Sequence, residues 1–544
     1  MKNLAVYRQI LVGNRWRGLT RPRGSFVAFL IPLLLIVSLT ACSSASTPTP
    51  TAPQAGGALP TPTQQETIKS GGALRVALPA NVLGMDPAFS LNTADIISTL
   101  QLYDNLVLRQ PDGSFRPMLA ESWTHNDELT EWTFHLRKGV KFQNGKDFEA
   151  EDVVFTFNRL LDPATGSPGR TSVEFIKEVI ADDPDTVRFV LKGPNAFVLS
   201  GLTIYQARIL PANVDVSRLQ NESFGTGPFS LVEFRPGERT IMKRNPDYWD
   251  SPRPYLDELV FFYMSEPETR VEALKDGSVD VVFPLEPTSL RALEGVPGVR
   301  VDEKASAAYL NLAMDTRVPP FDNKLVRKAV QLATDREAIR KVANLGRGAI
   351  ANDHPIPPSD PAYWKDQTIT PYDPQKARDL LAQAGHPSGI DLTLHTSTVE
   401  PGMTEMAVAF KESAAPAGIR VTIIREPEDA YWARVWMAEP FTTVTWNGRE
   451  PDEALTVVYM SSAEWNEAYY KDPELDALII QARRQVDNAE RNATYAEIQR
   501  KLIDQATRII TVFRPILVGV RTNVMGVEAH PNNWLILSEA WLNR

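Results

Sequence analysis

The fold of this 544-residue chain is decided by the stretch Trp132-Thr133-Phe134-His135-Leu136 and the residues around it. Apolar and polar residues alternate in this stretch, which is typical of a half-buried strand. The same alternation recurs in Val187-Arg188-Phe189-Val190-Leu191-Lys192. Asn144-Gly145 lies between the two and is a tight-turn signal. We therefore expect half-buried strands joined by turns in this part of the chain.

Helical patterns follow farther along. Apolar residues recur at helical spacing across 323–343. Asp472-Pro473-Glu474 places a capping residue, a proline and an acid where a helix begins. Helical periodicity continues from there to about Ala506, with a break expected at Asp487-Asn488. Alternating strands and helices predict an α/β or mixed α+β fold, but they do not by themselves indicate two lobes.

Residues 1–41 have the pattern of a secretory signal peptide. Six basic residues and no Asp or Glu precede Cys42, and an apolar run over 26–37 leads into Leu39-Thr40-Ala41-Cys42. This ending resembles the lipobox of bacterial lipoproteins, in which the cysteine is lipidated before cleavage and becomes the first residue. An uncleaved N-terminal anchor is the alternative, but the apolar run is short for a span, which needs ~20 apolar residues.

Cys42 is the only cysteine of the chain, so no disulfide can form within it. Residues 42–71 are rich in Ser, Thr, Pro, Ala and Gly, which predicts a flexible linker. Removal of residues 1–41 leaves 51 basic against 67 acidic residues, a net charge of −16. This charge argues against nucleic acid or anionic lipid as a partner. The expected membrane contact is the lipid on Cys42 alone.

Several short sequence motifs follow one another along the chain after residue 72. They are PMLAESW at 117–123, WTFHLRKGVKF at 132–142, NGK at 144–146, AEDVVFTF at 150–157, GTGPF at 225–229, RNPDYW at 244–249, ALKDGSVD at 273–280, PFDN at 320–323, VRKA at 326–329, YDP at 372–374 and KA at 376–377. Together they resemble the family 5 extracellular solute-binding proteins, the peptide/nickel-type receptors of ABC importers. The resemblance covers roughly residues 72–544.

This resemblance implies a periplasmic-binding-protein-like fold of two lobes joined by a hinge, with the ligand enclosed between them. By analogy, the first lobe holds residues 72–305 plus 515–544, with an extra subdomain inserted at about 107–220. The second lobe holds residues 306–514, and the crossing strands lie at 309–314 and 513–517. A transporter that binds only the closed form distinguishes the ligand-bound receptor from the empty one, because the ligand favours closure of the hinge.

The most informative candidate site is Trp446-Asn447-Gly448-Arg449-Glu450-Pro451-Asp452. In peptide-binding relatives, the segment after this Trp carries an aspartate that pairs with the α-amino group of the ligand. Here the matching place is shortened and holds Arg449. A buried Arg repels an ammonium group and favours a carboxylate, a phosphate or a hydroxyl-rich partner. The alternative is that Glu450 or Asp452 makes the amino-group contact and Arg449 pairs with one of them.

Aromatic residues complete the candidate site. Trp446 and Trp465 are candidates for stacking on a ligand, with core packing as the alternative. By the resemblance, Tyr103 and Tyr309 lie where relatives line the pocket or the hinge. The proline-rich loop over 352–358 could turn toward the cleft. Its His354 is better explained as a lone surface histidine than as a metal ligand, so no metal and no cofactor are expected.

The sequence carries no motif for catalysis. The six histidines lack ligand spacing on one helix, and neither a Gly-x-Ser-x-Gly elbow nor a Walker-type phosphate loop occurs. A secreted hydrolase that uses Glu450 and Asp452 as acid and base is a remote alternative, because nothing indicates that they face each other. A ligand sensor or chaperone of the same fold, without a dedicated transporter, is the second alternative.

The expected function is therefore that of a non-enzymatic receptor. It is anchored by lipid on the extracytoplasmic face of the cell membrane and acts as a monomer. It captures a small ligand, a peptide or another polar solute, and delivers it to ABC permease and ATPase subunits.

The lipid anchor can be tested directly. Cys42→Ala should abolish lipidation, because the chain has no other cysteine to acylate. Mass spectrometry of the membrane fraction should find diacylglycerol on residue 42 of the natural chain and none on the variant. Diacylglycerol on another residue would contradict the lipobox prediction.

Overall fold

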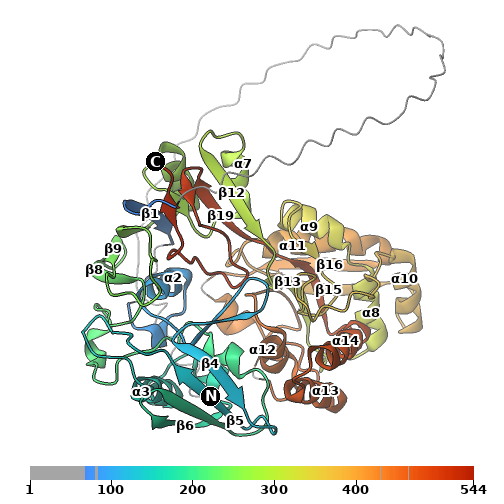
Figure 1. Ribbon diagram of the computed structural model, residues 1–544. Coiled ribbons are helices and arrows are strands. Elements are labelled where there is room, and N and C mark those ends of the chain that lie inside the picture. The colour runs from blue at the N-terminus through green and yellow to red at the C-terminus, as the bar shows by residue number, and fades with distance from the viewer. Residues whose placement is uncertain (1–67, 80–81, 83, 429, 464) are drawn as a thin grey trace, which may run out of the picture. The chain divides into compact units, whose positions relative to one another are not determined.

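A computed structural model describes residues 68–79, 82, 84–428, 430–463 and 465–544 (Figure 1). These residues belong to one unit, Ile68–Arg544. The expected signal peptide, Cys42 and nearly all of the expected linker lie outside the described residues. No helix in the described part combines the length and apolarity that a bilayer crossing requires.

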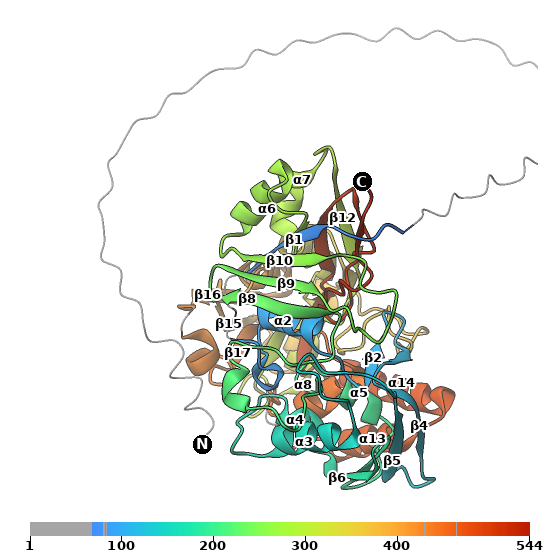
Figure 2. The ribbon, with the colours of Figure 1, turned by 60° about the vertical axis from the view of Figure 1, so that its left-hand side comes forward.

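A mixed seven-stranded sheet contains both the first described strand and a strand close to the C-terminus (Figure 2). β1 runs parallel to β10 and β11, whereas the other pairs are antiparallel. In spatial order the strands are β12 (Val299–Lys304), β19 (Ile516–Arg521), β11 (Val281–Val282), β1 (Ala73–Leu78), β10 (Glu258–Tyr263), β9 (Arg239–Arg244) and β8 (Phe229–Arg235).

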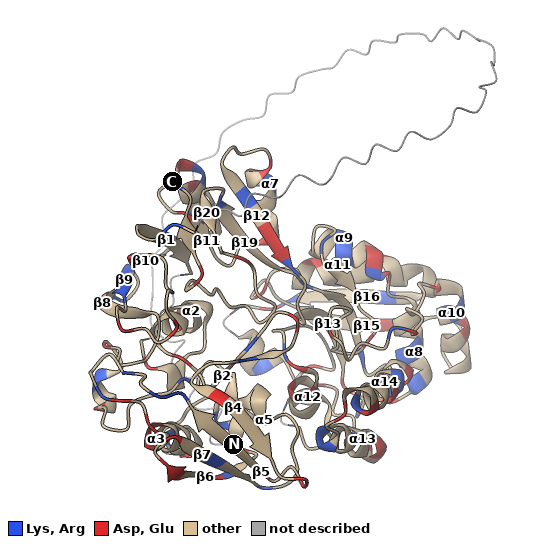
Figure 3. Cartoon of the chain, in the orientation of Figure 1, with Lys and Arg blue, Asp and Glu red and all other residues tan. Residues whose placement is uncertain are grey.

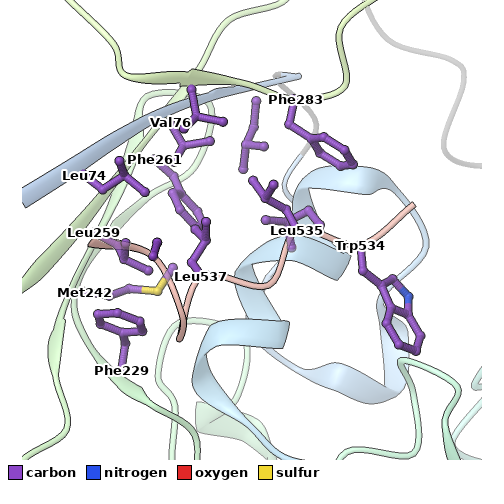
Figure 4. Close-up of a cluster of buried hydrophobic side chains, with 14 of the residues drawn as sticks. Leu74, Val76, Phe229, Met242, Leu259, Phe261, Phe283, Trp534, Leu535 and Leu537 are labelled. Carbon is purple, nitrogen blue, oxygen red and sulfur yellow. The ribbon is translucent and has the colours of Figure 1, made fainter. Parts of the chain in front are cut away.

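Helices cover both faces of this sheet. On one face, Leu74 and Val76 pack with α2 (Thr93–Leu102) and with Trp534, Leu535 and Leu537 near the C-terminus (Figure 4). On the other face, Ala77 packs against α6 (Pro267–Asp276) and α7 (Leu290–Leu293). The alternation along β1 thus places successive side chains in two separate cores.

A separate antiparallel sheet contains the strands predicted from the alternating patterns. Its order is β4 (Ala120–His125), β5 (Glu131–Leu136), β7 (Thr186–Leu191) and β6 (Ile176–Asp183). Trp132, Phe134 and Leu136 are buried, as the alternation predicts, and they share a core with α3 (Ala150–Leu161). The shorter elements near this sheet are β2 (Val107–Arg109), β3 (Phe115–Pro117), α4 (Arg170–Val173) and α5 (Val198–Leu202).

A six-stranded sheet contains the remaining long strands. Its order is β14 (Ala349–Ile350), β18 (Arg508–Phe513), β13 (Tyr309–Met314), β17 (Phe441–Trp446), β15 (Ile390–Thr396) and β16 (Ile419–Arg425). All six residues of β13 are buried, because Leu310 and Leu312 face one core and Tyr309 and Ala313 face another. A strand buried on both faces is expected to be mostly apolar. The one polar side chain of β13, Asn311, donates a hydrogen bond to Glu467 at 2.9 Å.

Helices cover both faces of this sheet. One core contains α8 (Lys324–Leu332), α9 (Arg336–Ala343), α10 (Pro374–Gln383) and α11 (Met403–Ala414). The other contains α13 (Pro473–Arg484), α14 (Asn488–Gln505) and the residues that directly follow α12 (Pro451–Ala454), namely Leu455, Val458 and Tyr459. Asp472 and Asp487 cap α13 and α14, at the helix start and the break predicted from sequence. The helical pattern over 323–343 forms two helices, because Asp335 caps a new one. Basic and acidic residues are interspersed along α9, α13 and α14 (Figure 3).

Two short segments join the six-stranded and seven-stranded sheets. Residues 305–308 connect β12 to β13, and residues 514–515 connect β18 to β19. The segments bind each other, since the Arg514 amide donates to the Ala308 carbonyl at 2.7 Å and the Ser306 hydroxyl donates to the Arg514 carbonyl at 2.7 Å. We call the part with the seven- and four-stranded sheets the first lobe and the part with the six-stranded sheet the second lobe. The residue boundaries expected from the resemblance stay a prediction.

Candidate ligand-binding site

A small pocket lies where the chain crosses between the lobes. Its outline encloses about 200 Å³, a volume that includes open solvent, and the side chains around it leave no interior room for a bound molecule in this conformation. Its lining comprises Ala307, Tyr309, Pro355, Trp446, Asn447, Arg449, Ala454 and Val458. Ala307 belongs to the crossing segment, and the other residues belong to the second lobe. The pocket brings together four residues that sequence analysis selected: Tyr309, Trp446, Asn447 and Arg449.

Trp446 forms one wall of this pocket at the end of β17. The strand pairs with β13, where Trp446 lies opposite Tyr309. Its ring lies 6.0 Å from the ring of Trp465 and 5.9 Å from that of Trp436, measured between centroids. The side chain is buried, and its indole Nε1 donates to Glu467 Oε1 at 3.4 Å. Trp446 therefore packs in a cluster of three indole rings, and its position is fixed by a hydrogen bond to the Glu467 carboxylate.

The Glu467 carboxylate is a buried acceptor for four groups. Arg508 Nε donates to Oε1 at 3.1 Å, and Asn311 Nδ2 donates to the same oxygen at 2.9 Å. Trp436 Nε1 donates to Oε2 at 2.8 Å, in addition to the Trp446 contact. The side chains of Glu467 and Arg508 are 1% and 2% exposed. A buried charge is tolerated when it is paired and its hydrogen bonds are satisfied, and here both conditions hold.

Arg449 lies over the indole of Trp446, which lines the pocket, and over the indole of Trp465, which is not among the lining residues. Its guanidinium carbon is 5.2 Å from the Trp446 ring centroid and 5.6 Å from that of Trp465, within the range of cation–π attraction. Its side chain is 22% exposed. Its contacts with acceptors are long, at 3.4 Å from Nε to Glu453 Oε1 and 3.4 Å from Nη1 to the Asn447 carbonyl. The guanidinium is thus positioned by aromatic faces and retains donor capacity for another partner.

The neighbouring carboxylates have arginine partners of their own. Glu450 pairs with Arg109 of the first lobe. Asp452 accepts from Arg483 Nε and Nη2, both at 3.1 Å. Burial raises the pKa of Asp452 and of Glu453 above the usual range. Arg449 therefore pairs with neither Glu450 nor Asp452, and among the described residues its ion pair is with Glu453.

The two tyrosines selected from sequence lie in different places. Tyr309 lines the pocket with Trp446, and burial raises its pKa well above the usual range. Tyr103 is 1% exposed in the first lobe and borders a second hollow with Asp104 and Arg116, whose interior volume is about 30 Å³. The Tyr103 side chain is therefore not part of the Trp446 pocket.

His354 is buried, which makes its interpretation as a surface histidine wrong. It is 0% exposed, and its Nε2 lies 3.0 Å from Gln367 Oε1. Burial lowers the pKa of His354 to about 4, so the ring is neutral at pH 7. The turn expected at 352–358 does bring Pro355 to the pocket. No group of three or more His, Cys, Asp or Glu residues in the described part is placed to hold a metal ion.

Sequence reasoning missed Glu467, although it lies two residues after Trp465. An acidic residue within an aromatic segment was the available signal, but its partners Asn311 and Arg508 are far away in the chain. Ala307, Ala454 and Val458 were also missed as lining residues, because small apolar side chains carry no chemical signal.

Comparisons with known proteins agree with this architecture. The family model described as bacterial extracellular solute-binding proteins, family 5 Middle, matches residues 114–469. Heme-binding protein A of Haemophilus influenzae is 30% identical over 460 residues, which cover 78% of this chain and 84% of the relative.

Two solved structures extend the comparison. The periplasmic binding protein DppA from Helicobacter pylori, in complex with the peptide STSA, has 29% identity and a TM-score of 0.74, covering 88% of this chain and 99% of its own. AgaA from Agrobacterium tumefaciens R10, in complex with agropinic acid, has 25% identity and a TM-score of 0.74, covering 87% and 99%. The fold is thus mixed α/β and two-lobed, as predicted.

The buried carboxylate can be tested by one substitution. Glu467→Gln leaves the Arg508 guanidinium buried without its anion, and such a change costs about 3–5 kcal/mol. The free energy of unfolding, measured in urea, should fall by that amount. Glu474→Gln in the same lobe is the matched control, because Glu474 pairs with Lys501 but is 85% exposed. The control should change stability by less than about 1 kcal/mol, and equal effects of the two variants would contradict the role assigned to Glu467.

Proposed function

The chain belongs to the family 5 bacterial extracellular solute-binding proteins, and from this premise we propose that it captures a small acidic solute between its two lobes. The receptor then delivers this solute to the permease and ATPase subunits of an ABC importer. It acts by binding and release rather than by catalysis. The DppA structure is described as associated with an ABC transporter, which supports this assignment.

The position of Arg449 is the observation that carries the acidic class of ligand. The guanidinium lies in the pocket at the crossing segment, over Trp446 and Trp465. Among the residues that the structure describes, Glu453 is the carboxylate that pairs with it, and the two meet at 3.4 Å rather than in a close bidentate pair. A ligand carboxylate or phosphate can form the bidentate pair that Glu453 does not, because the planar fork of Arg fits such groups.

The surroundings favour an acid over an amine. An ammonium group needs a carboxylate, but Glu450 and Asp452 are already paired with Arg109 and Arg483. Glu453 has the Arg449 cation itself 3.4 Å away, which would repel an ammonium group there. The similar proteins are named for or bound to heme, a peptide and agropinic acid, so the family does not prescribe one ligand. We propose that Arg449 and its two indoles recognise an acid group beside a flat or apolar portion of the solute.

The location of the protein forms a further part of the proposal. Cys42 is lipidated and holds the receptor on the extracytoplasmic face of the cell membrane, with residues 43–71 as the tether. The arrangement of a basic region, an apolar run and Leu39-Thr40-Ala41-Cys42 supports this. The receptor acts as a monomer, and the lipid is its only membrane contact.

Peptide probes that differ only in their terminal charges test the acidic preference. N-acetyl-trialanine keeps a carboxylate and lacks an ammonium group, whereas trialanine amide has the reverse. Calorimetry should give tighter binding of N-acetyl-trialanine, by roughly 10-fold or more, since a hydrogen bond to a charged group contributes about 1.5–3 kcal/mol. Arg449→Ala should remove this preference.

The matched control is Arg420→Ala, because Arg420 is an exposed arginine of the same lobe that pairs with Asp391. The Arg420→Ala variant should bind each of the two peptide probes with the same affinity as the natural chain. Tighter binding of trialanine amide, binding of neither probe, or identical behaviour of the two arginine variants would contradict the proposed function.

A further inference from the structure

A second set of contacts joins the lobes away from the crossing segments. Arg109, at the end of β2 in the first lobe, pairs with Glu450 of the second. The Ala196 amide donates to the Arg483 carbonyl at 2.9 Å. Phe197 packs against the second-lobe core, with its ring centroid 6.5 Å from that of Tyr495 and 5.1 Å from the Arg491 guanidinium carbon. An ion pair, a hydrogen bond and an aromatic contact thus bridge the lobes.

The first lobe holds this contact segment in a fixed geometry. Asn195 is 4% exposed, and its Oδ1 accepts from the Phe197 amide at 2.8 Å. Its own amide donates to the Leu129 carbonyl at 3.0 Å, and its carbonyl accepts from Trp132 Nε1 at 3.2 Å. The Ala196 amide and the Phe197 ring are therefore positioned before they meet the second lobe. Preorganisation of this kind lowers the entropy cost of forming a contact.

The second lobe offers an unsatisfied acceptor at the meeting point. Arg483 lies in the last turn of α13, where carbonyl groups lack a donor from their own helix. The Ala196 amide supplies that donor. Arg491 and Tyr495, both on α14, present an apolar and cationic surface that fits the Phe197 ring. When the lobes separate, water can replace the hydrogen bond, but the Phe197 ring loses its packing.

These contacts act on the segment that carries the candidate site. Glu450 follows Arg449 directly, and the side chain of Arg483 holds Asp452. We propose that Arg109, Ala196 and Phe197 form a latch that closes on α12, α13 and α14 when a solute occupies the Arg449 pocket. The inference rests on the proposed function, because it requires a solute between the lobes. By linkage, the latch strengthens solute binding by the factor by which the solute favours closure.

Hydrogen exchange at the Ala196 amide reports the latch directly. Mass spectrometry of peptides that cover Ala196 should show slower exchange with saturating N-acetyl-trialanine than without it. The Leu191 amide is the internal control, because it donates to the Thr130 carbonyl within the first lobe and should be equally protected in both states.

A substitution provides the second readout. Phe197→Ala should raise the dissociation rate of N-acetyl-trialanine by about 10-fold, with little change in its association rate, because the latch forms after encounter. Phe89→Ala is the matched control: Phe89 lies 5.7 Å from the guanidinium carbon of Arg159 in its own lobe and is 40% exposed. The control should leave both rates unchanged.

The outcomes separate the latch from the proposed function. If N-acetyl-trialanine binds in an Arg449-dependent way but exchange at Ala196 does not change, the latch is overturned and the proposed function stands. Equal dissociation rates for the Phe197 and Phe89 variants also overturn the latch. A chain that binds neither peptide probe, with no protection at Ala196, overturns both.

Discussion

The ion pair of Glu467 and Arg508 fixes the arrangement of the second lobe around the candidate site. Arg508 begins β18, Asn311 lies in β13 and Trp446 ends β17, and these three neighbouring strands all donate to the one carboxylate. Arg508 also donates to the Val458 carbonyl at 2.9 Å and to Asn466 Oδ1 at 3.0 Å. A charge buried at this depth is stable only with all of its partners, so the cluster forms together or not at all.

The candidate site follows from that cluster by short steps. Glu467 orients the Trp446 indole, and Trp446 together with Trp465 supports the guanidinium of Arg449. Gly448 brings this segment against the crossing strand, since a Cβ atom at this position would lie 3.2 Å from the Ala308 nitrogen. The cation therefore lies beside the segment that joins the lobes. A solute bound at Arg449 therefore lies beside the connection between the lobes, where its contacts can depend on how far apart the two lobes are.

Features set by neighbouring residues could be predicted from the sequence. The strand at 132–136 and the helix starts at Asp472 and Asp487 depend on local alternation and capping, and they appear where expected. The closeness of Trp446 and Arg449 is also local. The resemblance to a known family supplied the two-lobed fold, which periodicity alone did not indicate.

Features set by tertiary packing could not be predicted in this way. The partners of Glu467 are 156 and 41 residues away, so no spacing rule connects them. Tyr103 lies beneath the Gly225-Thr226-Gly227 turn, where a Cβ atom on Gly225 would lie 2.1 Å from the Leu102 carbonyl oxygen. This close approach buries Tyr103 away from the Trp446 pocket. The burial of His354 likewise depends on Gln367 and on packing, which its proline-rich neighbourhood does not reveal.

A small acidic molecule in the Arg449 pocket should remain bound through gentle purification. Native mass spectrometry of the chain, purified without denaturation from its own cells, should detect one bound molecule per chain that carries a carboxylate or phosphate group. The Arg449→Ala variant should lose this molecule. A bound molecule whose only charged groups are ammonium, or one that Arg449→Ala retains in full, would contradict an acidic ligand at Arg449.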